Sequence, residues 1–198
     1  MSPRPSKGVL QARAMLLASA HTLARVAEQE AERVEELARL FARTLRGGGA
    51  VYFCGNGGSA ADSQHLAAEL CGRFYQDRRP LRAAALTTNS SALTALANDY
   101  GHDVVFERQV RAYGRRGDVL VGLSTSGRSR NVLAALRAAR GLGMVTVGMT
   151  GARGRSMKRW CDHLLVVPNE DVARIQEGHI LLGHVICARA EALLFPGG

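Results

Sequence analysis

Apolar residues recur with a helical period through the first quarter of the chain. Four of them are spaced by three and four residues and therefore share one helical face: Val34, Leu37, Phe41 and Leu45. We expect helix over residues 8–46, in two segments, ending at Gly47-Gly48-Gly49 because glycine favours helix termination. A helix this long that precedes the first strand needs a surface for its apolar face, and a partner subunit would supply one.

After residue 49, short apolar runs alternate with helical segments. The expected strands are Ala50–Cys54, Arg82–Leu86, Asp118–Leu123, Met144–Met149 and Asp162–Val167. The expected helices are Ser59–Arg73, Ser90–Asn98, Asp103–Tyr113, a helix from the turn Ser124–Gly127 to Leu142, and Asp171–Leu194. Such alternation is typical of a parallel sheet covered by helices on both faces. We therefore predict an α/β fold, a three-layer, doubly wound sandwich with a five-stranded parallel sheet, in which one domain spans residues 1–198 as an N-terminal helical arm (1–46) and an α/β core (47–198).

The composition supports a packed domain and limits the choice of partners. Hydrophobic residues make up 46% of the 198 residues but aromatic residues only 5%, so aliphatic side chains must build the core. The net charge of +9 attracts anions, whether phosphate esters or nucleic acid. The basic residues are spread along the chain, without a long run of like charges or interleaved aromatic residues, so we expect no nucleic-acid partner.

The cysteines and the first residues indicate a reducing compartment. None of the cysteines forms a CxxC pair: Cys54, Cys71, Cys161 and Cys187. The segment Met1–Lys7 is polar, and no apolar signal-peptide stretch follows it. No apolar run approaches the ~20 residues of a membrane span. We therefore expect a cytoplasmic protein with free thiols and no membrane contact.

Two turns between a strand and a helix are suited to binding phosphate. The first, Cys54-Gly55-Asn56-Gly57-Gly58-Ser59, would bring backbone N–H groups close to an anion at a helix N-terminus. It matches neither the dinucleotide-binding pattern nor the P-loop, and an ordinary tight turn is the alternative interpretation. The second, Ser124-Thr125-Ser126-Gly127-Arg128-Ser129, adds four hydroxyl groups, of which helix capping alone would need one. Because both turns follow parallel strands, they should lie at the same edge of the sheet, where a phosphorylated small molecule would bind.

Candidate acid, base and metal-ligating groups lie on two of the predicted helices. His65 and Glu69 are four residues apart and share a helical face, so they could hold a divalent metal or act as an acid/base pair, although a solvated surface pair is common. The last helix carries Gln176, His179 and His184. Spacing does not decide which of these two histidines would join Gln176 at a site.

Other polar residues have ordinary explanations beside the functional one. Asn98 and Asp99 end a helix and could contact a sugar hydroxyl, but both residue types also favour such turns for local reasons. Arg73 could pair with Glu69 or with a substrate phosphate, and a surface role is the alternative.

Four ordered segments together resemble the sedoheptulose 7-phosphate isomerases, also called phosphoheptose isomerases. The segments are CGNGGSAADSQHLAAEL (Cys54–Leu70), ANDYG (Ala97–Gly101), GLSTSGRSRN (Gly122–Asn131) and RIQEGHILLGH (Arg174–His184). The resemblance extends from about residue 8 to residue 195. It implies a single SIS (sugar isomerase) domain that assembles as a homotetramer, and a reaction that converts sedoheptulose 7-phosphate to D-glycero-D-manno-heptose 7-phosphate.

The same resemblance implies roles for individual residues. Glu69 would be the base that moves a proton between C1 and C2 of an enediol, and His184 would be its acid/base partner. One zinc ion per subunit would be held by His65, Glu69, Gln176 and His184. The residues implied to contact the phosphorylated heptose are Asn56, Gly57, Gly58, Glu69, Asn98, Asp99, Ser124, Thr125, Ser126, Ser129 and Gln176. One departure is visible: Ala173 replaces an Asp of some members, so a contact that affects substrate preference is lost.

Two other functions fit parts of the sequence. A non-catalytic SIS-domain protein that binds the replication initiator shares the ARIQE segment and the ending Leu194-Phe195-Pro196. Such proteins lack the acidic residue at the position of Glu69 and the histidine at that of His184, both of which are present here. An isomerase of another ketose phosphate is the second alternative, whereas a phosphosugar-sensing regulator would need a DNA-binding module that the sequence lacks.

Overall fold

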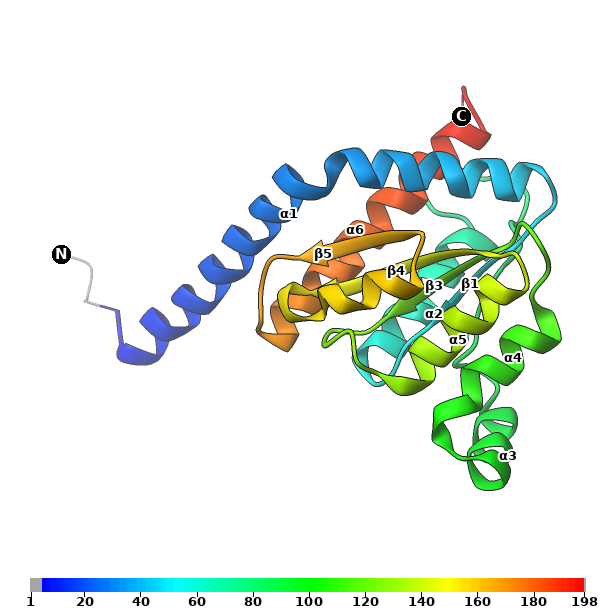
Figure 1. The fold of residues 1–198 in the computed structure, drawn as a ribbon. Helices are drawn as coiled ribbons and strands as arrows, with labels where there is room; N and C mark the ends of the chain where they lie inside the picture. The colour runs from blue at the N-terminus through cyan, green and yellow to red at the C-terminus, as the bar shows by residue number, and fades with distance from the viewer. Residues whose placement is uncertain (1–4, 198) are drawn as a thin grey trace.

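A five-stranded parallel sheet forms the centre of the protein, as seen in a computed structural model that describes residues 5–197 (Figure 1). The strands are β1 Val51–Cys54, β2 Ala83–Ala85, β3 Val119–Leu123, β4 Val145–Gly151 and β5 His163–Val167. Their order is β2-β1-β3-β4-β5, and every neighbouring pair is parallel. The predicted α/β fold and its five parallel strands are confirmed.

Helices cover both faces of the sheet. They are α1 Lys7–Arg46, α2 Gly58–Cys71, α3 Ser90–Tyr100, α4 Val105–Tyr113, α5 Arg130–Gly141 and α6 Val172–Leu194, with short 3-10 helices η1 His102–Val104 and η2 Ala152–Trp160. Alternate strand residues point to opposite faces, so the sheet divides the core in two. Val121 packs in the cluster formed with α1, α2 and α6, whereas its neighbour Leu120 packs with α4, α5 and η2.

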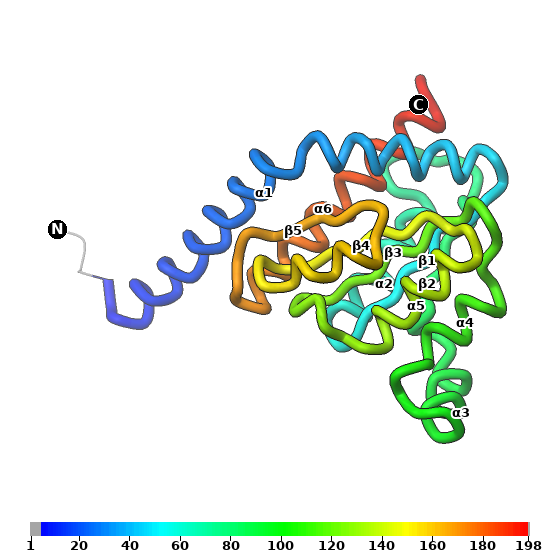
Figure 2. The backbone as a smooth tube through the Cα atoms, in the orientation of Figure 1, coloured from blue at the N-terminus to red at the C-terminus, as the bar shows by residue number. Residues whose placement is uncertain are grey.

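The long N-terminal helix is continuous, and the prediction of two segments is wrong. α1 runs without interruption from Lys7 to Arg46, because residues 9–46 contain neither glycine nor proline to end it. Its second half lies on the core through the predicted face that includes Leu37 and Phe41. Its first turns project from the rest of the protein (Figures 1 and 2), whereas Arg174 and Glu177 of α6 bond to Met15 and Ser19 farther along α1. Residues 1–4 and Gly198 lie outside the described residues. Residues 1–4 are the start of the predicted arm and make up most of the segment Met1–Lys7, for which no signal peptide was expected.

The remaining boundaries differ from the prediction only locally. β2 is limited to Ala83–Ala85 at the edge of the sheet, where it pairs with β1 alone. The 3-10 helix η2 had no predicted counterpart, since it carries no apolar helical period. None of the helices between residues 5 and 197 combines the length and the apolar character that crossing a bilayer requires.

Candidate active site

The two predicted phosphate-type turns begin side by side at the carboxyl edge of the sheet. They follow β1 and β3, which are neighbours paired in register from Val51 opposite Val119 to Cys54 opposite Gly122. Each turn leads directly into a helix, α2 after the first turn and α5 after the second. Two helix N-termini therefore lie at one edge of the sheet, which favours an anionic ligand there.

A pair of amide side chains ties the two turns together. Asn56 of the first turn donates to Asn131 Oδ1 at 2.9 Å, and Asn131 donates back to Asn56 Oδ1 at 2.8 Å. Asn131 is buried at the start of α5, where its Oδ1 also accepts a bond from the Val132 N–H. The sequence analysis gave Asn131 no role. The available signal was a polar residue at a helix start directly after the second turn.

The hydroxyl groups of the second turn gather around its backbone. Ser124 is buried, and its Oγ lies 2.9 Å from that of Ser129. Ser129 is the N-cap residue of α5 but makes no side-chain capping bond, so capping does not account for its hydroxyl. Gly127 has φ +64°, and a Cβ there would lie 2.6 Å from Cα of Gly154. The turn is therefore closed against the first residues of η2, and only glycine fits at its tip.

Each turn borders a hollow in the surface. The first turn lines one of about 280 Å³ with Leu93, His102 and Phe106 among its walls. The second lines one of about 310 Å³, to which Arg128 contributes positive charge, while Arg153 is paired there with Glu170. A larger hollow of about 510 Å³ lies between α1 and β5 and contains none of the predicted site residues, so we do not place the site there.

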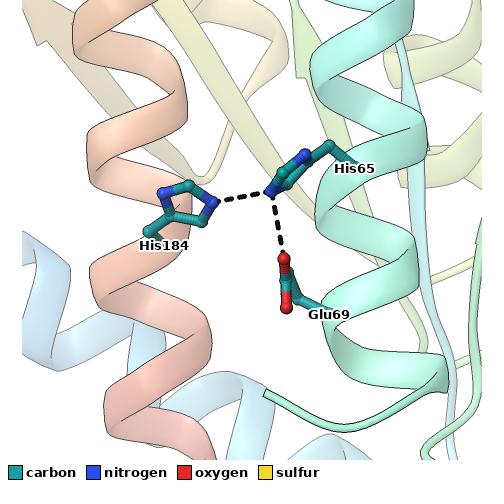
Figure 3. Close-up of side chains that lie close together, drawn as sticks. All are labelled: His65, Glu69 and His184. Atoms are coloured by element: carbon teal, nitrogen blue, oxygen red, sulfur yellow. Dashed lines mark hydrogen bonds and ion pairs between the residues drawn. The ribbon is translucent and has the colours of Figure 1, made fainter. Parts of the chain in front are cut away.

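Three of the predicted site residues converge between α2 and α6 (Figure 3). Nε2 of His65 lies 3.0 Å from Oε1 of Glu69 and 2.8 Å from Nε2 of His184. The three ligand atoms all lie within 4.8 Å of one another. Close packing of the two helices allows this, since a Cβ on Gly183 would lie 3.0 Å from Cγ of Leu66.

The surroundings of His184 lower the pKa of its imidazole. Partial burial lowers the pKa of His184, the neighbouring His65 lowers it further, and Glu69 acts in the opposite direction. A neutral His65 has either a proton or a lone pair at Nε2. If Nε2 of His65 carries the proton, that one proton must be shared between Glu69 and His184. If Nε2 carries the lone pair instead, it repels the carboxylate of Glu69. The three ligand atoms can each offer a lone pair, and a cation bound among them would remove their competition for one proton.

The donor set also fits a transition metal. Two imidazole nitrogens and a carboxylate oxygen are ligands that zinc takes in proteins, with an open position left for water or substrate. Ligands around a tetrahedral zinc ion, at about 2.0–2.1 Å each, lie roughly 3.3 Å from one another. Two of the observed separations, 2.8 and 3.0 Å, are slightly shorter, and the third pair of ligand atoms lies within 4.8 Å, so modest side-chain movements would bring all three to one ion.

Comparison with known proteins assigns the family. The SIS domain model matches residues 16–151. The phosphoheptose isomerase of Aliarcobacter butzleri is 53% identical over 171 residues, which cover 86% of this chain and 90% of that protein. The phosphoheptose isomerase of Nitratidesulfovibrio vulgaris is 55% identical over 168 residues, which cover 85% of this chain and 81% of that protein. The chain belongs to the phosphoheptose isomerase family of SIS-domain proteins. The predicted family is thus confirmed.

Solved structures of phosphoheptose isomerases agree with this assignment. The enzyme GmhA from Neisseria gonorrhoeae has a TM-score of 0.86 at 45% identity and covers 92% of this chain and 99% of its own. The phosphoheptose isomerase of Francisella tularensis has a TM-score of 0.89 at 32% identity, and the match covers 93% of this chain and 98% of that protein. The fold of this family member therefore matches theirs over nearly its whole length.

In this member of the phosphoheptose isomerase family, the two histidines of α6 lie in different environments. His184 faces His65 and Glu69, whereas His179 is fully buried, and the backbone of Thr150 offers it at most a weak interaction, too poorly aligned to count as a hydrogen bond among residues 5–197. Burial lowers the pKa of His179 to about 4. The structure thus places only His184 with the other candidates and keeps His179 as a neutral core residue.

The other predicted residues lie outside this group. Gln176 packs against the start of α2, where a Cβ on Gly58 would lie 2.8 Å from its Cδ. Asn98 and Asp99 are exposed on the last turn of α3, and Asn98 donates to Asp99 Oδ1 at 2.9 Å. Arg73 is exposed just beyond the end of α2.

One titratable residue near the group was not predicted. Asp62 lies three residues before His65 on α2, and its Oδ2 is buried without a hydrogen-bond partner in the described part of the chain. Burial raises its pKa to about 6, although His65 acts in the opposite direction. No sequence pattern marks Asp62, because its burial results from how α2 packs.

Proposed function

We propose that this protein isomerises sedoheptulose 7-phosphate to D-glycero-D-manno-heptose 7-phosphate, the first step toward nucleotide-activated heptose. The observation that supports it best is the convergence of His65, Glu69 and His184 beside an edge that carries two phosphate-type turns. The phosphoheptose isomerases to which the chain is similar supply the substrate class. We propose one SIS domain for the whole chain, with residues 1–46 as its arm and 47–198 as its core.

The proposed chemistry needs two proton-transfer groups. An aldose–ketose shift moves a proton between C1 and C2 through an enediol, and a second proton between the two oxygens. Glu69 is the base at carbon, and His184 handles the oxygen proton, since its lowered pKa leaves the imidazole neutral and able to accept. Positioned proton transfer of this kind contributes typically ~10²–10⁴-fold to the rate.

The turns and nearby amides would bind the rest of the substrate. Ser124, Thr125, Ser126 and Ser129 are proposed to hold the phosphate at the N-terminus of α5. The remaining contacts are proposed for Asn56, Gly57, Gly58, Glu69, Asn98, Asp99 and Gln176. Because the phosphate would be held mainly by neutral donors and helix dipoles, binding should depend on the turn geometry more than on a single cation.

We propose zinc as the cofactor, one ion per subunit, held by His65, Glu69, Gln176 and His184. The ligand atoms of His65, Glu69 and His184 all lie within 4.8 Å of one another. When bound, zinc would act as a Lewis acid toward the substrate carbonyl.

We also propose a cytoplasmic homotetramer. The first half of α1 exposes large apolar side chains that find no cover in the described part of the chain: Val9, Leu10, Met15, Leu16 and Leu17. Contiguous exposed apolar side chains of this kind indicate an interface. A second copy of the same chain is the occupant that we propose.

The deciding experiment is turnover of sedoheptulose 7-phosphate by the purified protein, with and without added zinc. We expect activity that Glu69→Gln and His184→Gln reduce at least about 100-fold. Glu107→Gln serves as the control because it removes a carboxylate of α4 that pairs with Arg111 and with none of the predicted site residues. No more than trace zinc in protein purified without chelator would count against the cofactor.

The same assay distinguishes the alternatives. If the protein turned over another ketose phosphate in preference to sedoheptulose 7-phosphate, the proposed mechanism would stand and the proposed substrate would be wrong. A folded protein without turnover of any ketose phosphate would favour the non-catalytic, initiator-binding function. The presence of Glu69 and His184 within one group argues against that outcome.

A further inference from the structure

The loop between α2 and β2 places an aromatic ring against the group of His65, Glu69 and His184. The ring of Phe74 stacks on the imidazole of His184, with centroids 5.7 Å apart and planes inclined by 21°. The other side of Phe74 packs against the core. Offset stacking at this separation is favourable and also restricts how the imidazole can turn.

A buried carboxylate fixes the backbone of this loop. Glu191 of α6 accepts hydrogen bonds from three successive N–H groups, those of Phe74 at 3.3 Å, Tyr75 at 2.9 Å and Gln76 at 3.2 Å. Glu191 is seven residues after His184, so both lie on the same face of α6. The helix that carries the imidazole therefore also holds the ring that stacks on it.

Arg78 completes the attachment. Its Nε donates to Glu191 at 2.9 Å, and the side chains of both residues are only 2% exposed. The rest of its guanidinium donates to the backbone carbonyls of Glu69 at 2.8 Å, Leu70 at 2.9 Å and Gly72 at 2.6 Å. The pair thus joins the end of α2, including the backbone of Glu69, to α6.

The imidazole needs such support because its own bonds leave it free to turn. The χ2 torsion of histidine is broad, so rotation about it costs little. Within residues 5–197, the ring of His184 is hydrogen-bonded to His65, whose own side chain is half exposed. Phe74 is stacked nearly parallel to the imidazole, whereas His65 meets it edge-to-face.

We propose that Phe74 is a positioning residue for His184, held in place by the buried pair of Glu191 and Arg78. This inference rests on the proposed function, in which His184 transfers a proton. Removing the ring would leave the imidazole in place but poorly oriented, which lowers the rate of the chemical step more than substrate binding. It would also weaken a metal held by His184.

The test compares three variants in the full-length protein. Phe74→Leu removes the flat ring but keeps an apolar side chain, and Phe74→Tyr keeps the ring. Phe195→Leu is the matched control, because Phe195 packs on the same core cluster and against Arg78 but does not contact His184. The readouts are kcat, KM, the melting temperature and the affinity for zinc by titration calorimetry.

We expect Phe74→Leu to lower kcat about tenfold with KM changed less than about twofold, and to weaken zinc binding about tenfold. Phe74→Tyr should restore both, and Phe195→Leu should lower only the melting temperature. Equal kcat and zinc affinity in the two leucine variants would overturn the inference, as would a tyrosine variant as impaired as Phe74→Leu. If the wild type does not turn over the heptose phosphate, the proposed function fails while the zinc comparison still decides the role of Phe74. A wild type without turnover and without zinc binding would overturn both.

Discussion

At the residue scale, the surroundings of each ionisable side chain decide what it can do. His179 and His184 lie on the same helix five residues apart, yet one is sealed in the core and the other faces two candidate ligands. Both have lowered pKa values, with burial as the main cause in each case. Only His184 also has neighbours with which it can exchange a proton.

Asp62 provides a test of burial in this region by pH. Its pKa in the folded protein is raised from 3.8 to about 6, so the folded state favours the protonated form. The stability that this contributes is present at low pH and is lost as the pH rises from about 4 through about 6. Asp62→Asn is neutral throughout and loses nothing.

We therefore expect metal-free Asp62→Asn to be more stable than the wild type at pH 7.5, by a margin that is clearly smaller at pH 4.5 and vanishes below a pH of about 3.8. Urea unfolding at the two pH values measures this margin. A margin of the same size at both would show that Asp62 ionises without penalty in the folded protein.

At the scale of elements, the active-site group depends on how closely α2 and α6 approach. Gly183 of α6 faces Leu66 of α2. His184 follows Gly183, His65 precedes Leu66, and these two histidines are hydrogen-bonded to each other. The site is therefore a consequence of helix packing rather than of either helix alone.

Gly183→Ala should push the two helices apart. The added methyl overlaps Leu66, and such overpacking costs about 1–3 kcal/mol of unfolding free energy. It should also lower kcat, since His65 and His184 separate. Gly141→Ala is the control, because nothing lies within 4 Å of a Cβ at the end of α5, and it should be neutral or slightly stabilising. Unfolding and turnover are measured on both, and equal stabilities would contradict the packing argument.

The pair of Glu191 and Arg78 is a second connection between elements. Glu191→Gln should destabilise the protein by about 3 kcal/mol, because Arg78 would keep a buried charge without its counter-charge. Glu35→Gln breaks surface pairs with Arg189 and Arg39 and should have a much smaller effect, because water screens exposed ion pairs. Denaturant unfolding of both variants measures the difference, and a small effect at Glu191 would mean that the loop is held by other contacts.

At the scale of the whole molecule, α1 both completes the core and extends beyond it. Its second half buries the predicted apolar face against the sheet and α6, whereas its first half exposes Leu16 at 72% and Met15 at 64%. The first half is stable only if the exposed face is covered, which is why we assign it to assembly.

Leu16→Glu should dissociate the proposed tetramer. A buried charge at a repeated interface is costly, and each lost leucine contact removes roughly 1.5–3 kcal/mol. Gln11→Glu adds the same charge to the same exposed arm and should leave assembly unchanged. Sedimentation velocity measures both, with circular dichroism to show that the fold persists. A Leu16→Glu variant that sediments like the wild type would exclude this face as the interface.

The sequence by itself determined the fold class, the strands and the two turns. These features depend on local interactions, namely apolar periodicity, glycine conformations and the rule that parallel strands end at the same edge. It also placed His65 and Glu69 on one helical face, because four residues make about one turn. The resemblance to the family added roles that local patterns do not reveal.

Tertiary structure decided what distant segments bring together. Spacing left His179 and His184 equivalent, and only the packing of α6 on α2 placed His184 beside His65. The same holds for Asn131, Asp62 and Phe74, none of which stands in a pattern that predicts its contacts. The continuous α1 was mispredicted as two segments because amphipathic periodicity alone does not show whether a helix follows one surface or extends past it. Contacts between distant segments depend on helix packing and side-chain rotamers, which no local pattern encodes.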